Sequence, residues 1–334
     1  MRRSRMGGWG RLAGGLLALW LGAASADAAP YRVFMVLHRT NTDADRGFKD
    51  YLRGAGLEVE FTVRNIEGDG TRLPAILQEI RAQHPDLVYT QSTLVTEGIV
   101  GRLGEVDPSR HLTDIPVVFA QVSDPVGLGL SPTLESSGRN LTGAIHVAPL
   151  DVQLKAMRAF KALKRLGLAY NPSELSQRIM YEKLARLTAQ AGIELVAVHP
   201  LGPDGKPDAA LLTTMLETLA AKKPDLVYVP PVNFFALHSK VLMSEALRLG
   251  LPTFCAIEVQ MEAGGMMGLV APLYNVGGLA GYKAVQILRD HRLPAELPIE
   301  ALSRFSFEVN MPAAHVLELY PPMGIMRYAR MRER

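Results

Sequence analysis

The sequence is poor in the residues and motifs that mark disulfide-bonded proteins, metal sites and common enzymes. Cys255 is the single cysteine among 334 residues, so no intrachain disulfide is possible. No Cys/His spacing typical of zinc is present. The chain also lacks a dinucleotide-binding glycine motif after its first predicted strand, a phosphate loop and a Gly-x-Ser-x-Gly elbow. We therefore predict no catalytic residue, no metal site and no cofactor.

Long apolar runs are missing after residue 28, which argues against a membrane-spanning helix there. The first residues differ from the rest. Four arginines within residues 1–11 precede an apolar run from Leu12 to Ala24, and small residues follow, Ala24-Ser25-Ala26. This arrangement predicts a signal peptide over residues 1–28, cleaved after Ala26 or Ala28. The alternative is an uncleaved anchor, but the run is shorter than the ~20 helical residues that span a membrane.

The chain has almost no excess of charge once the predicted signal peptide is removed. It contains 36 basic and 33 acidic residues, and residues 1–26 contribute four of the arginines and no acid. The remainder has 32 basic and 33 acidic residues, which does not favour nucleic-acid binding. No cysteine stands at the cleavage region, so we expect a free periplasmic protein without a lipid anchor.

Short β-branched runs alternate with amphipathic stretches from Tyr31 onward. This alternation predicts a parallel, doubly wound sheet. In the first half we predict strands at 31–37, 57–63, 87–90 and 116–120, and helices at 43–54, 72–83 and 94–103. The pattern restarts with strands at 166–170, 194–198, 226–229 and 253–256, and helices at 174–191, 209–222 and 235–249. The segment Pro-Asp-Leu-Val-Tyr occurs at the third strand of each half, which favours two equivalent lobes.

The predicted fold is therefore α/β, with two doubly wound parallel-sheet lobes joined by a multi-strand hinge. We assign residues 29–145 and about 272–292 to the N-terminal lobe, because a helix at 276–289 is expected to return there. Residues 146–271 and about 300–320 are assigned to the C-terminal lobe, although the lobe of the last strand, 305–309, stays open. The stretch 141–147 is expected to be an extended crossover, and residues 321–334 are interpreted as a solvated basic tail.

Several motifs resemble one known family. The clearest are Asp124-Pro125-Val126-Gly127, Asn140-Leu141-Thr142-Gly143 and Asn171-Pro172-Ser173-Glu174. In combination they are similar to ABC-transporter substrate-binding proteins with the type I periplasmic-binding fold, in the branch that includes tryptophan- and tyrosine-binding proteins. The resemblance covers residues 31 to about 320. It implies a hinged cleft that closes on a small solute, with an aromatic solute as one candidate. The chain departs from the family pattern at Leu175-Ser176, Pro230-Pro231 and Leu273-Tyr274, all in predicted cleft loops.

Ligands of doubly wound sheets bind beyond the carboxyl ends of the strands. The predicted ligand-binding residues follow such strands or a crossover: Ser92, Thr93, Ser123, Asn171, Ser176, Asn233, Glu258 and Tyr274. His38 and Arg39 follow the first strand and either face the cleft or form a plain surface pair.

Each of these residues also has a purely structural interpretation. Ser92 or Thr93 either caps a helix or opens a helix start that holds a carboxylate. Glu258 either pairs with a ligand ammonium group or is a solvated acid. Asn171 either reaches the ligand or belongs to helix capping, and Tyr274 either stacks on the ligand or packs in the hinge.

The sequence thus predicts a monomeric solute receptor that delivers a small molecule, amino acid-like or aromatic, to a permease with a cytoplasmic ATPase. A periplasmic sensor that engages a membrane histidine kinase is the alternative. A transcriptional regulator shares the fold, but the signal peptide and the absence of a helix-turn-helix before Tyr31 argue against it.

Overall fold

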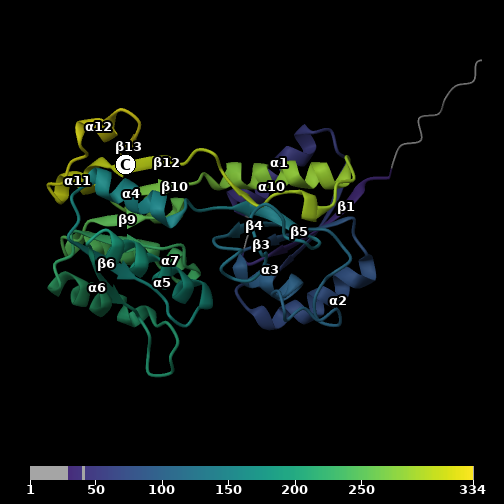
Figure 1. The fold of residues 1–334 in the computed structure, drawn as a ribbon, viewed down its shortest axis with the longest axis horizontal. Coiled ribbons are helices and arrows are strands. Elements are labelled where there is room, and N and C mark those ends of the chain that lie inside the picture. The colour runs from purple at the N-terminus through teal and green to yellow at the C-terminus, as the bar shows by residue number, and fades with distance from the viewer. Residues whose placement is uncertain (1–28, 40–41, 334) are drawn as a thin grey trace, which may run out of the picture.

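The computed structural model describes residues 29–39 and 42–333, which form two α/β lobes arranged along the long axis of the molecule (Figure 1). The predicted signal peptide, residues 1–28, lies outside the described residues. Within the described ranges, no helix has both the length and the apolar character needed to cross a membrane.

Lobe one is built on a six-stranded parallel sheet with the strand order β11-β5-β4-β3-β1-β2. Its four central strands are buried almost throughout, as expected when helices cover both faces of a parallel sheet, whereas the two edge strands are only partly buried. The strands are β1 (Tyr31–Leu37), β2 (Val59–Asn65), β3 (Leu87–Gln91), β4 (Val117–Val122), β5 (Leu141–Ile145) and β11 (Glu300–Ala301). The helices are α1 (Asp43–Gly54), α2 (Leu73–Gln83), α3 (Thr93–Val100) and α10 (Leu273–Leu288), with 3₁₀ turns at Gly70–Arg72 and Pro294–Glu296.

Lobe two repeats this strand order and extends it at one edge, as β13-β12-β10-β9-β8-β6-β7. Only the β10–β12 pair is antiparallel among the described strand pairs. The strands are β6 (Arg165–Ala169), β7 (Glu194–Val198), β8 (Leu226–Val229), β9 (Thr253–Cys255), β10 (Met267–Val270), β12 (Ser306–Asn310) and β13 (Arg330–Arg332). The helices are α4 (Leu150–Phe160), α5 (Leu175–Gln190), α6 (Leu212–Ala221), α7 (Asn233–Leu237), α8 (Ser239–Arg248), α9 (Glu258–Glu262), α11 (Met311–Val316) and α12 (Met323–Met326), with a 3₁₀ turn at Ala209–Leu211.

The repeated Pro-Asp-Leu-Val-Tyr segment has the same structural role in both lobes. Asp86 accepts a hydrogen bond from the Arg32 amide (2.7 Å), and Asp225 accepts one from the Arg165 amide (2.9 Å). The two arginine side chains complete the match by donating to backbone carbonyls at the end of the preceding helix. The aspartate thus ties the start of the third strand to the first strand, which explains why this short motif recurs.

The chain crosses between the lobes three times, after β5, β10 and β11. These segments run along the upper edge of the molecule in Figure 1. Val147 and Val270, from two of them, form an antiparallel bridge. The predicted hinge of several crossing segments therefore exists, and each lobe keeps separate hydrophobic clusters on its own sheet.

Four expectations about individual segments need correction. The stretch 141–147 is not an extended crossover, because β5 pairs with β4 inside lobe one and the crossing begins only after it. The helix predicted at 235–249 is divided into α7 and α8. Helix α10 begins at Leu273, three residues before the predicted start. The predicted tail is not solvated throughout the part that the structure describes, residues 321–333, since β13 pairs with β12 and Arg332 contacts the buried carboxylate of Glu308 (2.5 Å).

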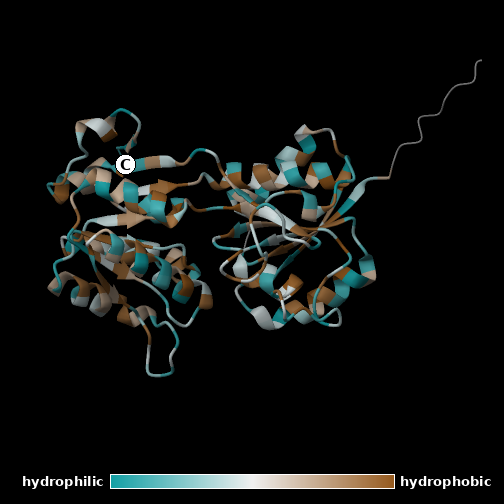
Figure 2. Ribbon diagram, viewed as in Figure 1, coloured by the Kyte–Doolittle hydropathy of each residue, from teal (hydrophilic) through white to brown (hydrophobic). Residues whose placement is uncertain are grey.

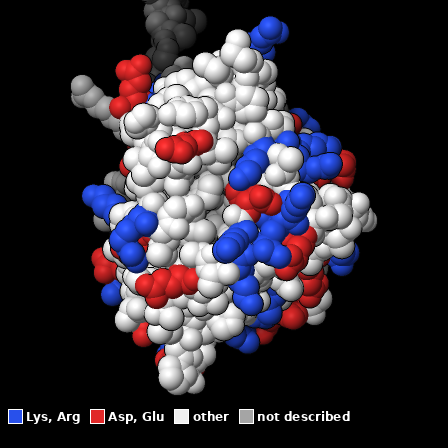
Figure 3. Space-filling view, turned by 90° about the vertical axis from the view of Figure 1, so that its left-hand side faces the viewer, with Lys and Arg blue, Asp and Glu red and all other residues white. Residues whose placement is uncertain are grey.

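The distribution of charged residues on the surface agrees with the nearly equal numbers of basic and acidic residues in the sequence. Hydrophobic residues concentrate along the strands and the inner helix faces (Figure 2). Figure 3 views the end of the molecule that lobe two forms, where lysines and arginines gather with acidic residues among them. Ion pairs of lobe two include Arg165–Glu194 (2.7 Å) and Lys161–Asp225 (3.9 Å). The lobe-two end therefore presents mixed charge, with anions interspersed among its cations.

Candidate ligand-binding site

A cleft of about 940 Å³ lies between the lobes. Pockets for small molecules usually enclose roughly 300–1,000 Å³. Most of the lining residues follow β1, β3 and β4 of lobe one and β6, β8 and β9 of lobe two, where the carboxyl ends of the strands meet. Gly68, His146 and Leu273 add the segments after β2, β5 and β10, so the topology brings loops of both sheets to one site.

A buried polar network fixes the lobe-one wall of the cleft. Asp45, only 1% exposed, accepts hydrogen bonds from the Tyr89 hydroxyl (2.9 Å) and from Gln91 Nε2 (2.8 Å). The Thr42 amide also donates to this carboxylate (2.6 Å). Burial raises the pKa of Asp45, and the hydrogen bonds from Thr42 and Tyr89 oppose that shift. Because its members satisfy one another, the network holds the start of α1 rigidly against the end of β3.

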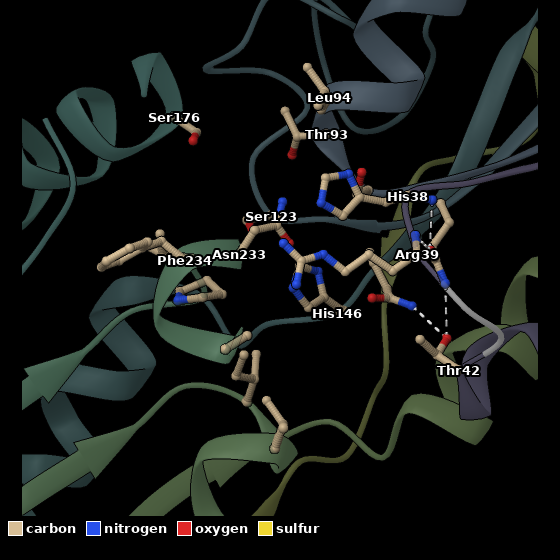
Figure 4. A pocket seen from close by; sticks show the side chains of 18 of the residues that line it. His38, Arg39, Thr42, Thr93, Leu94, Ser123, His146, Ser176, Asn233 and Phe234 are labelled. Carbon is tan, nitrogen blue, oxygen red and sulfur yellow. Dashed lines mark hydrogen bonds between the residues drawn. The ribbon is translucent and has the colours of Figure 1, made fainter. Parts of the chain in front are cut away.

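A bulge at the end of β4 adds Gln121 to the same network. The register with β5 shifts between Ala120 and Val122, and Gln121 has a φ of 63°. A bulge redirects the side chain of the extra residue. Here it allows Gln121 Nε2 to donate to Thr42 Oγ1 (3.0 Å), as Figure 4 shows. The polar end of β4 is thereby joined to the first loop of the lobe.

Ser92 stands at the start of α3 in a conformation that L-residues rarely adopt, with φ 80° and ψ 161°. Its side chain makes no capping bond, and its Oγ is buried without a hydrogen-bond partner among the described residues. The first amides of a helix lack intrahelical acceptors and favour negative charge. The start of α3 thus presents Ser92 Oγ and the Thr93 end of the helix to the cleft.

Arg39 gives lobe one a cation at the cleft, and two histidines that are neutral near pH 7 lie in the same wall. His38 and His146 are nearly buried, and burial lowers the pKa of each to about 4. Both ring nitrogens of His38, and Nδ1 of His146, have no partner among the described residues. Arg39 forms no ion pair with any residue that the structure describes, and Figure 4 shows its side chain near both rings. These groups are available to an anionic part of a ligand.

Lobe two contributes carboxylates from the opposite wall. Glu258 begins α9, and its Oε2 accepts a hydrogen bond from the Leu273 amide (2.9 Å) at the start of α10. Burial raises the pKa of Glu258 and of Glu174. Asn233 and Phe234, at the start of α7, face the lobe-one histidines across the cleft in Figure 4. The cleft therefore has Arg39 and two neutral histidines on one wall, together with Asp43 and Glu97, and carboxylates with an aromatic ring on the other.

The comparison with protein families identifies the family of the protein that contains this cleft. The family described as "ABC transporter substrate binding protein" matches residues 33–331 of the chain. The chain belongs to this family. The family is one of solute-binding proteins.

Individual relatives are more distant. The chain is 22% identical to the tyrosine-binding protein of Clostridioides difficile (strain R20291) over 276 residues, which are 82% of this chain and 74% of that protein. A structure of an ABC domain in complex with L-Trp from Streptococcus pneumonia is similar, with a TM-score of 0.76, 21% identity, and coverage of 91% of this chain and 99% of that one. A conserved domain protein from Vibrio cholerae gives a TM-score of 0.77, 22% identity and coverage of 90% and 99%. These structures share the predicted type I periplasmic-binding fold.

Most of the residues predicted to contact a ligand line the cleft of this substrate-binding protein. The cleft brings together Ser92, Thr93, Ser123, Ser176, Asn233 and Glu258. Asn171 does not reach it. That side chain is buried, accepts from Ser173 Oγ (2.7 Å) and donates to Glu174 Oε1 (2.8 Å), so it holds the turn before α5 and caps none of the helix amides.

Tyr274 also lies away from the cleft. Because α10 begins at Leu273, Tyr274 falls in the first helical turn on the outer side of lobe one. Its hydroxyl donates to Asp50 (3.2 Å) and Arg46 stacks over its ring. The proposed stacking on a ligand in the cleft is therefore wrong for this conformation, and packing against α1 replaces it.

Several cleft residues were missed by the sequence analysis: Thr42, Gln91, Gln121, His146 and Phe234. Strands β3 and β4 end one and two residues later than predicted, at Gln91 and Val122, so a longer strand assignment would have included both glutamines. His146 follows β5 directly, and its role was hidden by the expected crossover over 141–147. Phe234 could have been predicted as a cleft residue, because it is an aromatic residue directly after the predicted Asn233.

Proposed function

We propose that this substrate-binding protein is exported to the periplasm and delivers an amino acid-like solute, with an aromatic side chain as the first candidate, to a permease driven by a cytoplasmic ATPase. The predicted signal peptide supports export. The family supports the role of a receptor for a transporter. The single observation that carries the ligand class is the placement of Arg39 and the start of α3 on one wall of the cleft and of Glu258 on the other.

A zwitterion fits these walls in one orientation. Its carboxylate would meet the start of α3, Ser92 Oγ and Arg39 in lobe one, where positive potential is available. Its ammonium group would meet Glu258 in lobe two. Phe234 offers a ring for the side chain of the ligand. A ligand held by both walls stabilises the closed arrangement, because an open cleft cannot make both sets of contacts.

A direct binding test is available because both tryptophans, Trp9 and Trp20, precede residue 29. Protein starting at residue 29 has no tryptophan emission, so the fluorescence of added L-tryptophan reports its own binding. We expect saturable binding, competed by related amino acids. Native mass spectrometry of protein purified from its own periplasm will name any retained solute. Absence of binding by every amino acid and related zwitterion tried, with a non-zwitterionic solute retained, would overturn the ligand class.

The role of Glu258 can be tested with a matched neighbour. Glu258→Gln keeps an acceptor for the Leu273 amide but removes the charge, and Glu262→Gln removes an exposed charge that also borders the cleft. A charged hydrogen bond contributes about 1.5–3 kcal/mol, so we expect Glu258→Gln to weaken amino-acid binding roughly tenfold or more. Glu262→Gln should bind nearly as the wild type does. Equal affinity of the two variants would contradict the proposed ammonium site.

A further inference from the structure

The two lobes touch through a pair of side chains at the border of the cleft. Asp124, in the loop after β4 of lobe one, forms an ion pair with Lys183 of α5 in lobe two. The side chains are 29% and 40% exposed. Asp124 belongs to the Asp124-Pro125-Val126-Gly127 motif on which the family resemblance rests. It also forms a turn within that motif, since its Oδ1 accepts from the Gly127 amide (2.9 Å).

An apolar contact lies beside the ion pair. Ile179, one helical turn before Lys183 on α5, packs against the hydrophobic cluster of lobe one, which includes Leu128 and Leu130. A Cβ at Gly127 would lie 3.0 Å from Ile179 Cγ2 and would overlap the Asp124 carboxylate. Gly127 therefore allows α5 of lobe two to approach this loop closely.

Both sides of this contact lead directly into the ligand cleft. Ser176, Ile179 and Lys183 are three and four residues apart, so they lie along one face of α5. Ser176 lines the cleft at one end of that face. In lobe one, Ser123 and Leu128 line the cleft on either side of the Asp124 turn. The loop is anchored, because Leu128 and Leu130 are buried and their amides bond within the turn.

The crossing segments also connect the lobes. They run along the upper edge of the molecule in Figure 1, and α5 lies below them. Opening about such a hinge separates groups that belong to different lobes. Asp124 and Lys183 belong to different lobes and neither is part of a crossing segment, so opening of the cleft breaks their contact.

We propose that Asp124, Lys183, Ile179 and Gly127 form an interlobe latch that favours the closed cleft and slows release of the bound solute without touching it. Lys183 is a positioning residue in this scheme. The inference rests on the proposed function for its effect on a ligand, but the effect on lobe closure requires no ligand.

The first measurement follows lobe closure without ligand. Spin labels are placed at two exposed helical positions, Arg53→Cys in lobe one and Lys240→Cys in lobe two. Cys255 is fully buried, so labelling is confined to the introduced thiols. Electron–electron distance distributions are then compared between the wild type and Lys183→Glu. We expect repulsion from Asp124 to reduce the population at the shorter distance.

The second measurement follows release of L-tryptophan by stopped flow. We expect Lys183→Glu to release it roughly two- to five-fold faster, the range typical of a partly exposed ion pair. The effect should shrink as salt is added, because exposed charges are screened. Arg186→Met, which removes an exposed charge from the same helix, serves as the control.

A double-mutant cycle separates the latch from a loss of folding. Asp124→Asn keeps the acceptor for Gly127 but removes the charge, so Lys183→Met should have no further effect in that background. The latch is wrong if Lys183→Glu and Arg186→Met have the same distance distribution as the wild type. If L-tryptophan does not bind, the ligand proposal fails, whereas the distance measurement still decides the latch.

Discussion

Ser92 illustrates, at the scale of one residue, how the fold stores strain where the ligand is expected. Its φ of 80° and ψ of 161° lie in a region that is essentially restricted to glycine, at a cost of about 1–3 kcal/mol. Its hydroxyl is buried without a partner among the described residues. Neither property stabilises the fold, so both are understandable only if this residue serves the cleft.

Replacing Ser92 by glycine should separate stability from binding. We expect Ser92→Gly to raise the free energy of unfolding by about 1 kcal/mol, because the strained backbone suits glycine. We also expect weaker binding of the amino-acid ligand, because the hydroxyl is lost. Ser92→Ala should weaken binding to a similar degree without relieving the backbone strain. Chemical denaturation and ligand titration measure the two effects, and unchanged affinity in both variants would exclude Ser92 from the site.

At the scale of helices, α1 and α10 lie in direct contact through glycine. A Cβ at Gly277 would overlap the Ala44 carbonyl oxygen, and one at Gly47 would overlap the Tyr274 carbonyl oxygen. The two backbones therefore approach at a distance that no larger residue permits. Since α10 returns to lobe one directly after a crossing segment, this contact also fixes one end of the hinge.

Alanine substitutions in these helices should have opposite signs. Gly277→Ala must push the helices apart, and we expect it to lower the free energy of unfolding by about 1–3 kcal/mol. Gly54→Ala, in an exposed position of α1 with free space around it, should raise this free energy by up to about 1 kcal/mol. Thermal or urea unfolding measures both. Equal effects of the two substitutions would contradict the close contact.

The sequence predicted the elements better than the site. Periodicity located the alternating strands and helices of both lobes, because burial on both sheet faces leaves short apolar runs, but it did not predict α4, α9, α12, β11 or β13. Contacts between segments that are distant in the sequence produce no such periodic pattern. Tyr274 was predicted at the cleft because the start of α10 was predicted three residues too late. Asn171 was predicted at the cleft because its hydrogen bond to Glu174 could not be foreseen from the sequence. The bulge at Gln121 is a feature of the folded sheet, so composition and spacing did not reveal it.

At the scale of the whole molecule, the cleft histidines couple stability to pH. His38 and His146 are buried neutral, with pKa values of about 4 against an ordinary value of 6.5. Between pH 6.5 and 4 the unfolded chain binds protons that the folded chain does not. The free energy of unfolding should therefore fall as the pH falls through this window, by on the order of 3 kcal/mol for each histidine.

The pH profile can be tested by removing one of the two groups. We expect His146→Gln to flatten the decrease between pH 6.5 and 4 by about half. His84→Asn, at an exposed position whose left-handed backbone asparagine tolerates, should leave the profile unchanged. Urea denaturation at a series of pH values gives the comparison. Parallel profiles for the wild type and His146→Gln would contradict a buried neutral histidine at this position.

The first described strand lies in lobe one and the last, β13, lies at the far edge of the lobe-two sheet, so the chain enters and leaves at distant places along the long axis (Figure 1). Donor and acceptor fluorescent proteins fused at residues 29 and 333 would therefore ride on different lobes, clear of the cleft. Bending at the hinge would change energy transfer between them. The topology of this receptor thus suits it to serve as a genetically encoded optical sensor for its own solute.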